Sequence, residues 1–238
     1  DAIVGDASAI VGPAWAFNGQ SVAEKKTIPY VGAHLWPLGV PSAYDPPVIR
    51  DIPGLIRKPK TTLTIAWNRF VIGVAKQVMR LMFAKYLNPP RASYGLGRLS
   101  RTPVLDFQLE PALVLGLYSP HFSPRTADMP PELALTGFPL IKDEANEPDP
   151  ELDGFMDGEP IVFTLGSILS ENPGSFYEAS IEAAQRLGKR ALILSNKPIL
   201  EAPPNDVLLR GYVPHSKVFP KAKVIVHHGG IGTTARAL

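Results

Sequence analysis

The chain has 238 residues, 45% of them hydrophobic, and a formal net charge of +2, so it can form one large globular domain or two small ones. It has no cysteine, which excludes disulfides, thiolate nucleophiles and cysteine-bound metals and is compatible with a reducing compartment. The histidines lack the spacing of a zinc site, so we expect no metal held by the protein.

The small net charge hides two segments of opposite charge. Residues 50–101 hold eleven Lys or Arg and one acid, Asp51, whereas residues 143–159 hold eight acids and no base. Two solvated surfaces that partly neutralise each other are the ordinary interpretation. The alternative is a peripheral contact of the basic region 50–101 with an anionic membrane or an acidic acceptor, which would place a cytoplasmic protein at the inner face of a membrane. We expect no nucleic-acid partner.

The first 60 residues predict a βαβ unit followed by a loop. The pattern favours a strand at 1–6 (DAIVGD), a helix from about 14 to 25 and a strand at 28–35 (IPYVGAHL). Short connections between such elements imply a parallel sheet. The proline-rich residues 36–60 predict a long loop with a functional role.

Apolar residues recur at helical spacing over residues 61–87, with charges too frequent for a bilayer span. We expect a helix packed on the domain, or two helices with a break near Gly73. A membrane-surface helix with basic flanks is the alternative. Further strands are predicted in PALVLGLYSP and LALTGFP, at 111–120 and 133–139.

The acidic, proline-bearing segment 143–158 is the predicted linker between domains at 1–142 and 159–238. After it, strands and helices alternate again, which predicts a second parallel α/β domain. The expected strands are 161–167, 190–195, 208–213 and 223–228, and the expected helices are 173–187, a short turn at 214–219, and one that starts at Ile231.

GIGTTA, residues 230–235, fits the G-x-G-x-x-G/A pattern of dinucleotide-binding turns. Its glycines allow a phosphate close to the backbone, the first N–H groups of the helix attract an anion, and Thr233 and Thr234 add hydroxyl donors. In a Rossmann dehydrogenase this turn follows the first strand of its domain. Here three predicted strands come earlier, which disfavours a dehydrogenase.

The segment RGYVPHSKVFPKAKVIVHHGGIGTTARAL, residues 210–238, resembles the nucleotide-sugar site of GT-B glycosyltransferases of the UDP-glucosyltransferase type. The similarity is to the bacterial branch with rhamnosyltransferases and sterol glucosyltransferases. GEPIVFTLGS at 158–167 resembles the first strand and phosphate loop of that family's C-terminal domain. SAYDPP at 42–47 and the segment 111–140 resemble its N-terminal domain.

This resemblance implies two Rossmann-like parallel-sheet domains. Residues 1–142 would be part of the acceptor-binding domain, and residues 159–238 the first part of the nucleotide-sugar-binding domain. We interpret the chain as the middle of a longer protein, with both domains incomplete.

The resemblance also assigns roles to residues. His228 would bind a phosphate oxygen, the backbone of Val213 would meet the nucleobase, and Ser167 would lie near the diphosphate. The turn that receives the diphosphate is formed by Gly230, Gly232 and Thr233, with Thr234 beside it. Asp6 would orient a catalytic histidine that is not in this chain.

Each assignment has a structural alternative. His227 and His228 are adjacent at a strand end and should point to opposite sides, so one of them is expected to serve packing. Ser167 could merely cap a helix, and Asp6 could be an ordinary strand-end residue.

The implied activity is inverting transfer of a sugar from a UDP- or dTDP-linked donor to the hydroxyl of a small hydrophobic acceptor, without a cofactor. The sequence has no D-x-D motif, which agrees with metal independence. The catalytic histidine and a sugar-contacting Asp-Gln pair would lie outside the chain, so we expect this polypeptide alone to be inactive. The alternatives are a non-catalytic nucleotide-binding or auxiliary homologue and a GT-B sugar-nucleotide epimerase.

Overall fold

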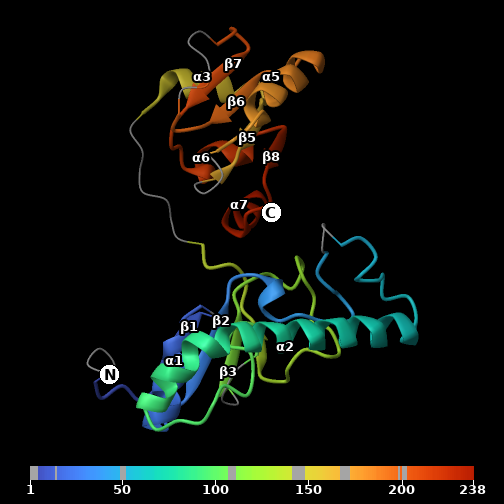
Figure 1. Cartoon of the computed structure of the whole chain (residues 1–238). Helices are drawn as coiled ribbons and strands as arrows, with labels where there is room; N and C mark the ends of the chain where they lie inside the picture. The colour runs from blue at the N-terminus through green and yellow to red at the C-terminus, as the bar shows by residue number, and fades with distance from the viewer. Residues whose placement is uncertain are drawn as a thin grey trace. The chain divides into compact units, whose positions relative to one another are not determined.

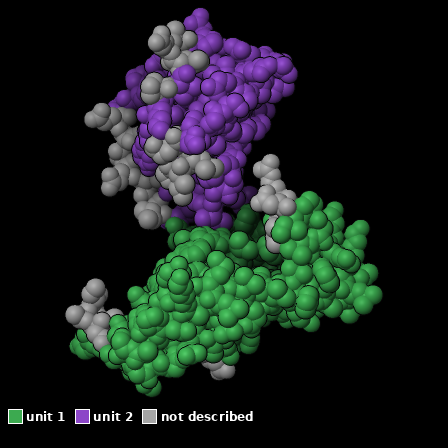
Figure 2. Space-filling view, in the orientation of Figure 1, with its two compact units in different colours: residues 1–139 green, residues 140–238 purple. Residues whose placement is uncertain are grey.

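The computed structural model describes residues 5–13, 15–48, 52–106, 111–140, 148–166, 172–197, 199 and 203–238. The chain divides into two compact units, Asp1–Pro139 and Leu140–Leu238, which Figure 2 shows in different colours. The domain boundary that the sequence predicts after residue 142 lies outside the described residues.

Unit 1 is built on a four-stranded parallel sheet in the order β1-β2-β3-β4 (Figure 1). Its core centres on Val40, Val114, Met129 and Leu133. The elements in chain order are β1 (Ile10–Pro13), α1 (Phe17–Lys26), β2 (Tyr30–His34), the short 3-10 helix η1 (Pro37–Gly39), α2 (Thr62–Ser93), β3 (Leu113–Gly116) and β4 (Leu133–Leu135). The predicted helix at 14–25 and the predicted strands at 28–35, 111–120 and 133–139 are confirmed.

The first strand that the structure describes lies after residues 1–6, where the sequence predicts one. Residues 1–4 of that predicted strand lie outside the described residues, and Gly5 and Asp6 form a turn. Strand β1, Ile10–Pro13, repeats the letters IVG and pairs with β2 from Ile10 opposite Tyr30. Gly12 leaves room for the Tyr30 ring, since a Cβ there would lie 2.6 Å from the phenolic oxygen.

Helix α2 runs as a single rod that extends well beyond the strands of unit 1 (Figure 1). It begins after Thr61, whose hydroxyl accepts the Thr64 N–H while the Thr64 hydroxyl accepts the Thr61 N–H, which forms a capping box. The predicted break near Gly73 is wrong. One glycine costs a helix only about 1 kcal/mol, and buried Asn68 and Val71 hold this part of α2 to the unit.

Arg91 fastens the end of α2 to α1. Its side chain is 2% exposed, and its guanidinium donates to both carboxylate oxygens of Glu24, at 2.8 and 3.1 Å, and to the Gly97 carbonyl at 2.8 Å. Removal of one partner from such a buried pair leaves the other charge poorly solvated.

We therefore expect Arg91→Met to lower the free energy of unfolding of unit 1 by about 3 kcal/mol. Urea titration followed by tryptophan fluorescence measures this, because Trp15, Trp36 and Trp67 are the three tryptophans and all belong to unit 1. Exposed Arg69→Met is the control and should change stability little. Equal effects of the two variants would contradict the role of Arg91.

A buried histidine makes unit 1 sensitive to pH. His34 is 4% exposed, and burial lowers its pKa from 6.5 to about 4. Since the pKa is depressed in the folded state, the stability linked to the neutral ring is present above pH 6.5 and is lost as the pH falls towards 4. His34→Gln should flatten this dependence of the urea midpoint, and exposed His121→Gln should not. An unchanged slope in His34→Gln would refute this prediction.

Unit 2 is a second four-stranded parallel sheet, in the order β7-β6-β5-β8. Its elements are α3 (Pro150–Met156), β5 (Ile161–Thr164), α5 (Phe176–Arg186), β6 (Ala191–Leu194), β7 (Val207–Arg210), α6 (His215–Val218), the 3-10 helix η2 (Phe219–Lys221), β8 (Val224–His227) and α7 (Ile231–Ala237). These confirm the strands and helices that the sequence predicts in this half.

Alternate residues of the central strands fill two cores on opposite faces of this sheet. Val162 and Leu192 pack with α3, α6 and η2, whereas Phe163 and Ile193 pack with α5. Strands that are apolar on both sides are typical of parallel sheets covered by helices. The predicted α/β class with two parallel sheets is thereby confirmed.

The acidic segment is partly structured rather than only a linker. Asp149 caps α3, and Leu152 and Met156 of this helix are buried in the core of unit 2. The amphipathic spacing of these two residues is masked in the sequence by the surrounding acids. The helix therefore belongs to the folded unit.

The acids of this segment pair with cations of their own unit. Asp149 and Glu151 bind Arg210 at 2.7 and 2.5 Å, and the Arg210 guanidinium lowers the pKa of Asp149 to about 2. The remaining pairs are Asp153 with Lys217, Asp157 with Lys221, and Glu159 with Lys223. The five acids at 149–159 thus have cationic partners inside unit 2.

Candidate functional site

The order of strands in unit 2 defines a switch point. The chain enters the sheet at β5, adds β6 and β7 on one side, and then crosses to add β8 on the other. Loops that leave neighbouring strands in opposite directions open a crevice at their carboxyl ends, where open α/β sheets bind ligands.

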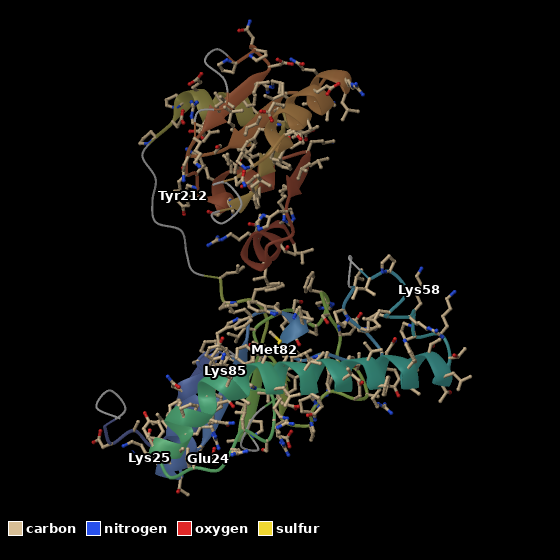
Figure 3. The ribbon with its side chains drawn as sticks, in the orientation of Figure 1. Glu24, Lys25, Lys58, Met82, Lys85 and Tyr212 are labelled. Atoms are coloured by element: carbon tan, nitrogen blue, oxygen red, sulfur yellow. The ribbon has the colours of Figure 1, made fainter. Side chains whose placement is uncertain are left out.

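A pocket of about 340 Å³ lies at these carboxyl ends. Its polar groups come from the end of β5, the end of β6, the loop after β7 and the first turns of α7. Tyr212, on the loop after β7, is labelled in Figure 3. The lining residues are Thr164, Gly166, Leu194, Ser195, Asn196, Gly211, Tyr212, Val213, His215, Gly232, Thr233 and Arg236.

The start of α7 presents unsatisfied backbone donors to this pocket. Gly230 is the N-cap, and the first intrahelical bond is donated by the Thr234 N–H to the Gly230 carbonyl at 2.9 Å. The preceding N–H groups of the turn therefore have no acceptor within the helix. A Cβ at Gly232 would meet no atom within 4 Å, so the backbone is open on the pocket side.

Positive charge and hydroxyl donors surround the same turn. Thr233 lines the pocket and is buried, and Arg236 lines it one turn further along α7. Backbone N–H groups, a hydroxyl and a guanidinium together are the groups that bind phosphate oxygens. The pocket is therefore chemically suited to an anion with several oxygen acceptors.

His228 lies against two glycines of this site. A Cβ at Gly230 would be 2.4 Å from His228 Nε2, and a Cβ at Gly166 would be 2.9 Å from His228 Cε1. Gly166 also has φ +64°, a conformation that favours glycine. The imidazole therefore occupies the border between the β5 loop and the turn before α7, and it is exposed to solvent.

His227 has a different environment. Its Nδ1 accepts the Gly229 N–H at 3.2 Å, which stabilises the turn, and Gly229 has φ +83°. Burial, with a smaller contribution from His228, lowers the pKa of His227. The two histidines thus make different contacts, and the assignment of His228 as the ligand stays a prediction.

The other predicted residues fall into three groups. Val213, Gly232 and Thr233 line the pocket. Thr234 does not, and its hydroxyl donates to the Gly230 carbonyl at 3.0 Å. Ser167 lies outside the described residues, and Asp6 is exposed in a turn of unit 1.

Several lining residues were not predicted from the sequence. Thr164, Ser195 and Asn196 follow or end buried strands, and polar residues at that position could have pointed to them. Arg236 stands four residues after Gly232, so helical spacing places both on one face of α7.

Within the described ranges, no group of three or more His, Asp or Glu side chains is arranged to hold a metal ion. Nor does any helix in those ranges combine the length and apolar character that crossing a bilayer requires.

Sequence comparisons identify glycosyltransferases as relatives. The chain is 36% identical over 131 residues to a sterol 3-beta-glucosyltransferase of Arabidopsis thaliana, a match that covers 51% of this chain and 20% of the relative. It is 34% identical over 157 residues to the O-mycaminosyltylonolide 6-deoxyallosyltransferase of Streptomyces fradiae, a match that covers 64% of this chain and 36% of the relative. The chain thus spans only a minor part of both relatives. No protein-family model matches it.

Solved glycosyltransferases share the fold. The glycotransferase of kitacinnamycin superimposes with a TM-score of 0.65 at 17% identity and covers 99% of this chain and 56% of its own. A spinosyn rhamnosyltransferase complexed with thymidine diphosphate gives a TM-score of 0.57 at 15% identity over 97% of this chain and 50% of its own. The fold class predicted from the sequence is GT-B, and these neighbours confirm it. The chain therefore has the GT-B fold and is similar in sequence to glycosyltransferases.

Proposed function

We propose that the protein takes part in transfer of a sugar, with inversion at the anomeric carbon, from a nucleotide diphosphate sugar to an acceptor hydroxyl. The observation that carries the proposal is the pocket at the switch point of unit 2, which Gly232, Thr233 and Arg236 of α7 line together. The donor would be UDP- or dTDP-linked. The solved rhamnosyltransferase with thymidine diphosphate supports a nucleoside diphosphate as ligand.

Sugar transfer requires the protein to stabilise a leaving group. The acceptor oxygen forms a bond to the anomeric carbon, the bond from that carbon to the diphosphate breaks, and the acceptor proton passes to a base. The N–H groups of the α7 turn, the Thr233 hydroxyl and His228 would carry the negative charge that develops on the diphosphate. Ser167 and Thr234 would lie beside them, although the Thr234 hydroxyl already bonds Gly230.

The nucleobase would lie at the opposite end of the pocket. Val213 is 5% exposed, and its backbone is the proposed contact with the base. Near it the His215 ring stacks on Phe219, with centroids 4.3 Å apart and planes 10° apart. This pair makes that wall of the pocket rigid. Asp6 of unit 1 would orient a catalytic histidine, a role that depends on residues outside the chain.

The acceptor would be small and hydrophobic. The proline-rich loop of unit 1 encloses an apolar pocket of about 160 Å³ whose walls include Leu38, Val40 and Met129. The names of the relatives describe a sterol and O-mycaminosyltylonolide as acceptors of those proteins. We place the protein in the cytoplasm, at the inner face of a membrane that the basic region 50–101 approaches.

Titration of the chain with UDP, dTDP and uridine tests the donor site. The amide resonances of Gly166, Val213 and Gly230 to Thr234 should shift with both diphosphates, and uridine should move Val213 more than the α7 turn. Unmoved resonances in the α7 turn would refute the proposal. Product analysis with the whole protein then distinguishes transfer from binding without turnover and from epimerisation of the donor alone.

A further inference from the structure

Helix α2 leaves a row of large apolar side chains uncovered. Six of them, spaced three or four residues apart, form what we call the α2 stripe: Leu63, Trp67, Phe70, Val74, Val78 and Leu81. Each is at least 37% exposed, and Leu63 reaches 83%. Met82 and Tyr86 extend the row, which is about 35 Å long from Leu63 to Tyr86 at 1.5 Å per residue.

Other residues of the same helix pack on unit 1. Asn68 and Arg91 are buried on other sides of the helix, Val71 is buried at the edge of the stripe, and Asn68 donates to the Ala43 and Arg57 carbonyls. The stripe is therefore not the core-facing side of an ordinary amphipathic helix. A contiguous apolar surface of this length on a folded unit marks a contact site.

Exposed cations lie on α2 and on the loop before it. Lys58, Lys60, Arg69 and Lys85 are exposed, and no ion pair between described residues involves them. Figure 3 shows Lys58 on the loop before α2, and Met82 and Lys85 farther along the helix. No acid occurs in the sequence from residue 52 to residue 101, and the acids of 149–159 pair within unit 2.

Near each end of the α2 stripe, a cation lies over an aromatic ring. The Arg57 guanidinium is 5.1 Å from the Trp67 ring centroid, and the Lys85 ammonium is 5.9 Å from that of Tyr86. The Trp67 Nε1 donates to the Leu55 carbonyl at 2.8 Å. Amphipathic rings beside Lys or Arg, on a helix with an apolar face, are typical of helices that lie in a membrane interface.

We infer that α2 seats the protein on an anionic lipid surface, with the α2 stripe in the acyl boundary and the exposed cations at the headgroups. This inference rests on the proposed location at the inner face of a membrane and names the surface that makes the contact. A second copy of the chain is the competing occupant. A two-fold interface would place two copies of this cationic, acid-free region against each other, and their repulsion would cost free energy. An anionic lipid surface would instead attract the cations.

Sedimentation with vesicles tests the inference. The chain should bind vesicles of phosphatidylcholine and phosphatidylglycerol, bind pure phosphatidylcholine far less, and release at high salt. Bromine-labelled acyl chains should quench Trp67 in a variant with Trp15→Phe and Trp36→Phe. The double variant Phe70→Asp with Leu81→Asp should bind anionic vesicles about 100-fold less, since each buried Phe or Leu contributes about tenfold.

The matched control is Leu187→Asp, an equally exposed apolar residue of unit 2. It should leave vesicle binding unchanged. Equal binding to neutral and anionic vesicles, no loss in the double variant, or a stable dimer that the double variant dissociates would each overturn the inference. UDP should bind the double variant as tightly as it binds the unchanged chain. UDP binding therefore tests the donor site independently of vesicle binding, so the failure of one proposal does not decide the other.

Discussion

Gly232→Val is expected to weaken UDP binding about 100-fold, because it would deny the phosphates at least two hydrogen bonds from the α7 turn, each worth about 1.5–3 kcal/mol to a charged acceptor. Gly232 lines the pocket, and a Cβ there meets no atom within 4 Å. The valine side chain would therefore fill space that the ligand needs without a clash inside the protein. Isothermal titration with UDP and dTDP measures the effect.

Gly154→Val is the matched control for this variant. Gly154 is an exposed glycine of α3 in the same unit, and a Cβ there also meets no atom within 4 Å. The control should bind UDP normally, and both variants should keep their thermal unfolding midpoints close to that of the unchanged chain. UDP affinity that Gly232→Val leaves intact would show that the diphosphate does not lie at α7.

His228→Ala is expected to weaken UDP binding about 10- to 100-fold and to leave uridine binding unchanged. The reason is the loss of one hydrogen bond to a charged phosphate oxygen, worth about 1.5–3 kcal/mol. The imidazole lies where a Cβ at Gly166 or Gly230 would clash with it, which places it beside the turn before α7. Comparison of UDP with uridine separates a contact with phosphate from a general loosening of the site.

His121→Ala, at an exposed histidine of unit 1, controls for removal of an imidazole elsewhere. A second variant, His228→Gln, keeps a side-chain donor and should recover part of the UDP affinity. If His228→Ala weakened uridine and UDP by the same factor, the histidine would support the turn rather than bind phosphate.

Much of the fold could be predicted because its signals are local. The blocks IVFT, ALIL and VIVH are short, apolar and bounded by turn residues, and each is a strand that lies within its predicted range. The turn before α7 was predicted for the same reason, since Gly230 and Gly232 stand between a strand and a helix.

The failures have non-local causes. The letters AIVG occur twice near the start of the chain, and pairing with β2 and packing against the Tyr30 ring place a strand at the second copy, which the sequence did not predict. Helix α3 was hidden in an acidic segment because its partners, such as Arg210, are about sixty residues away and neutralise the charge only after folding.

The sequence by itself determined the two parallel α/β units, the glycine turn and the residue types at that turn, because apolar periodicity and turn chemistry act over a few residues. The tertiary structure decided which polar strand ends meet in one pocket, which acids are neutralised and which face of α2 stays uncovered. Those properties depend on contacts between residues far apart in the chain, since burial and charge pairing exist only once distant segments have come together.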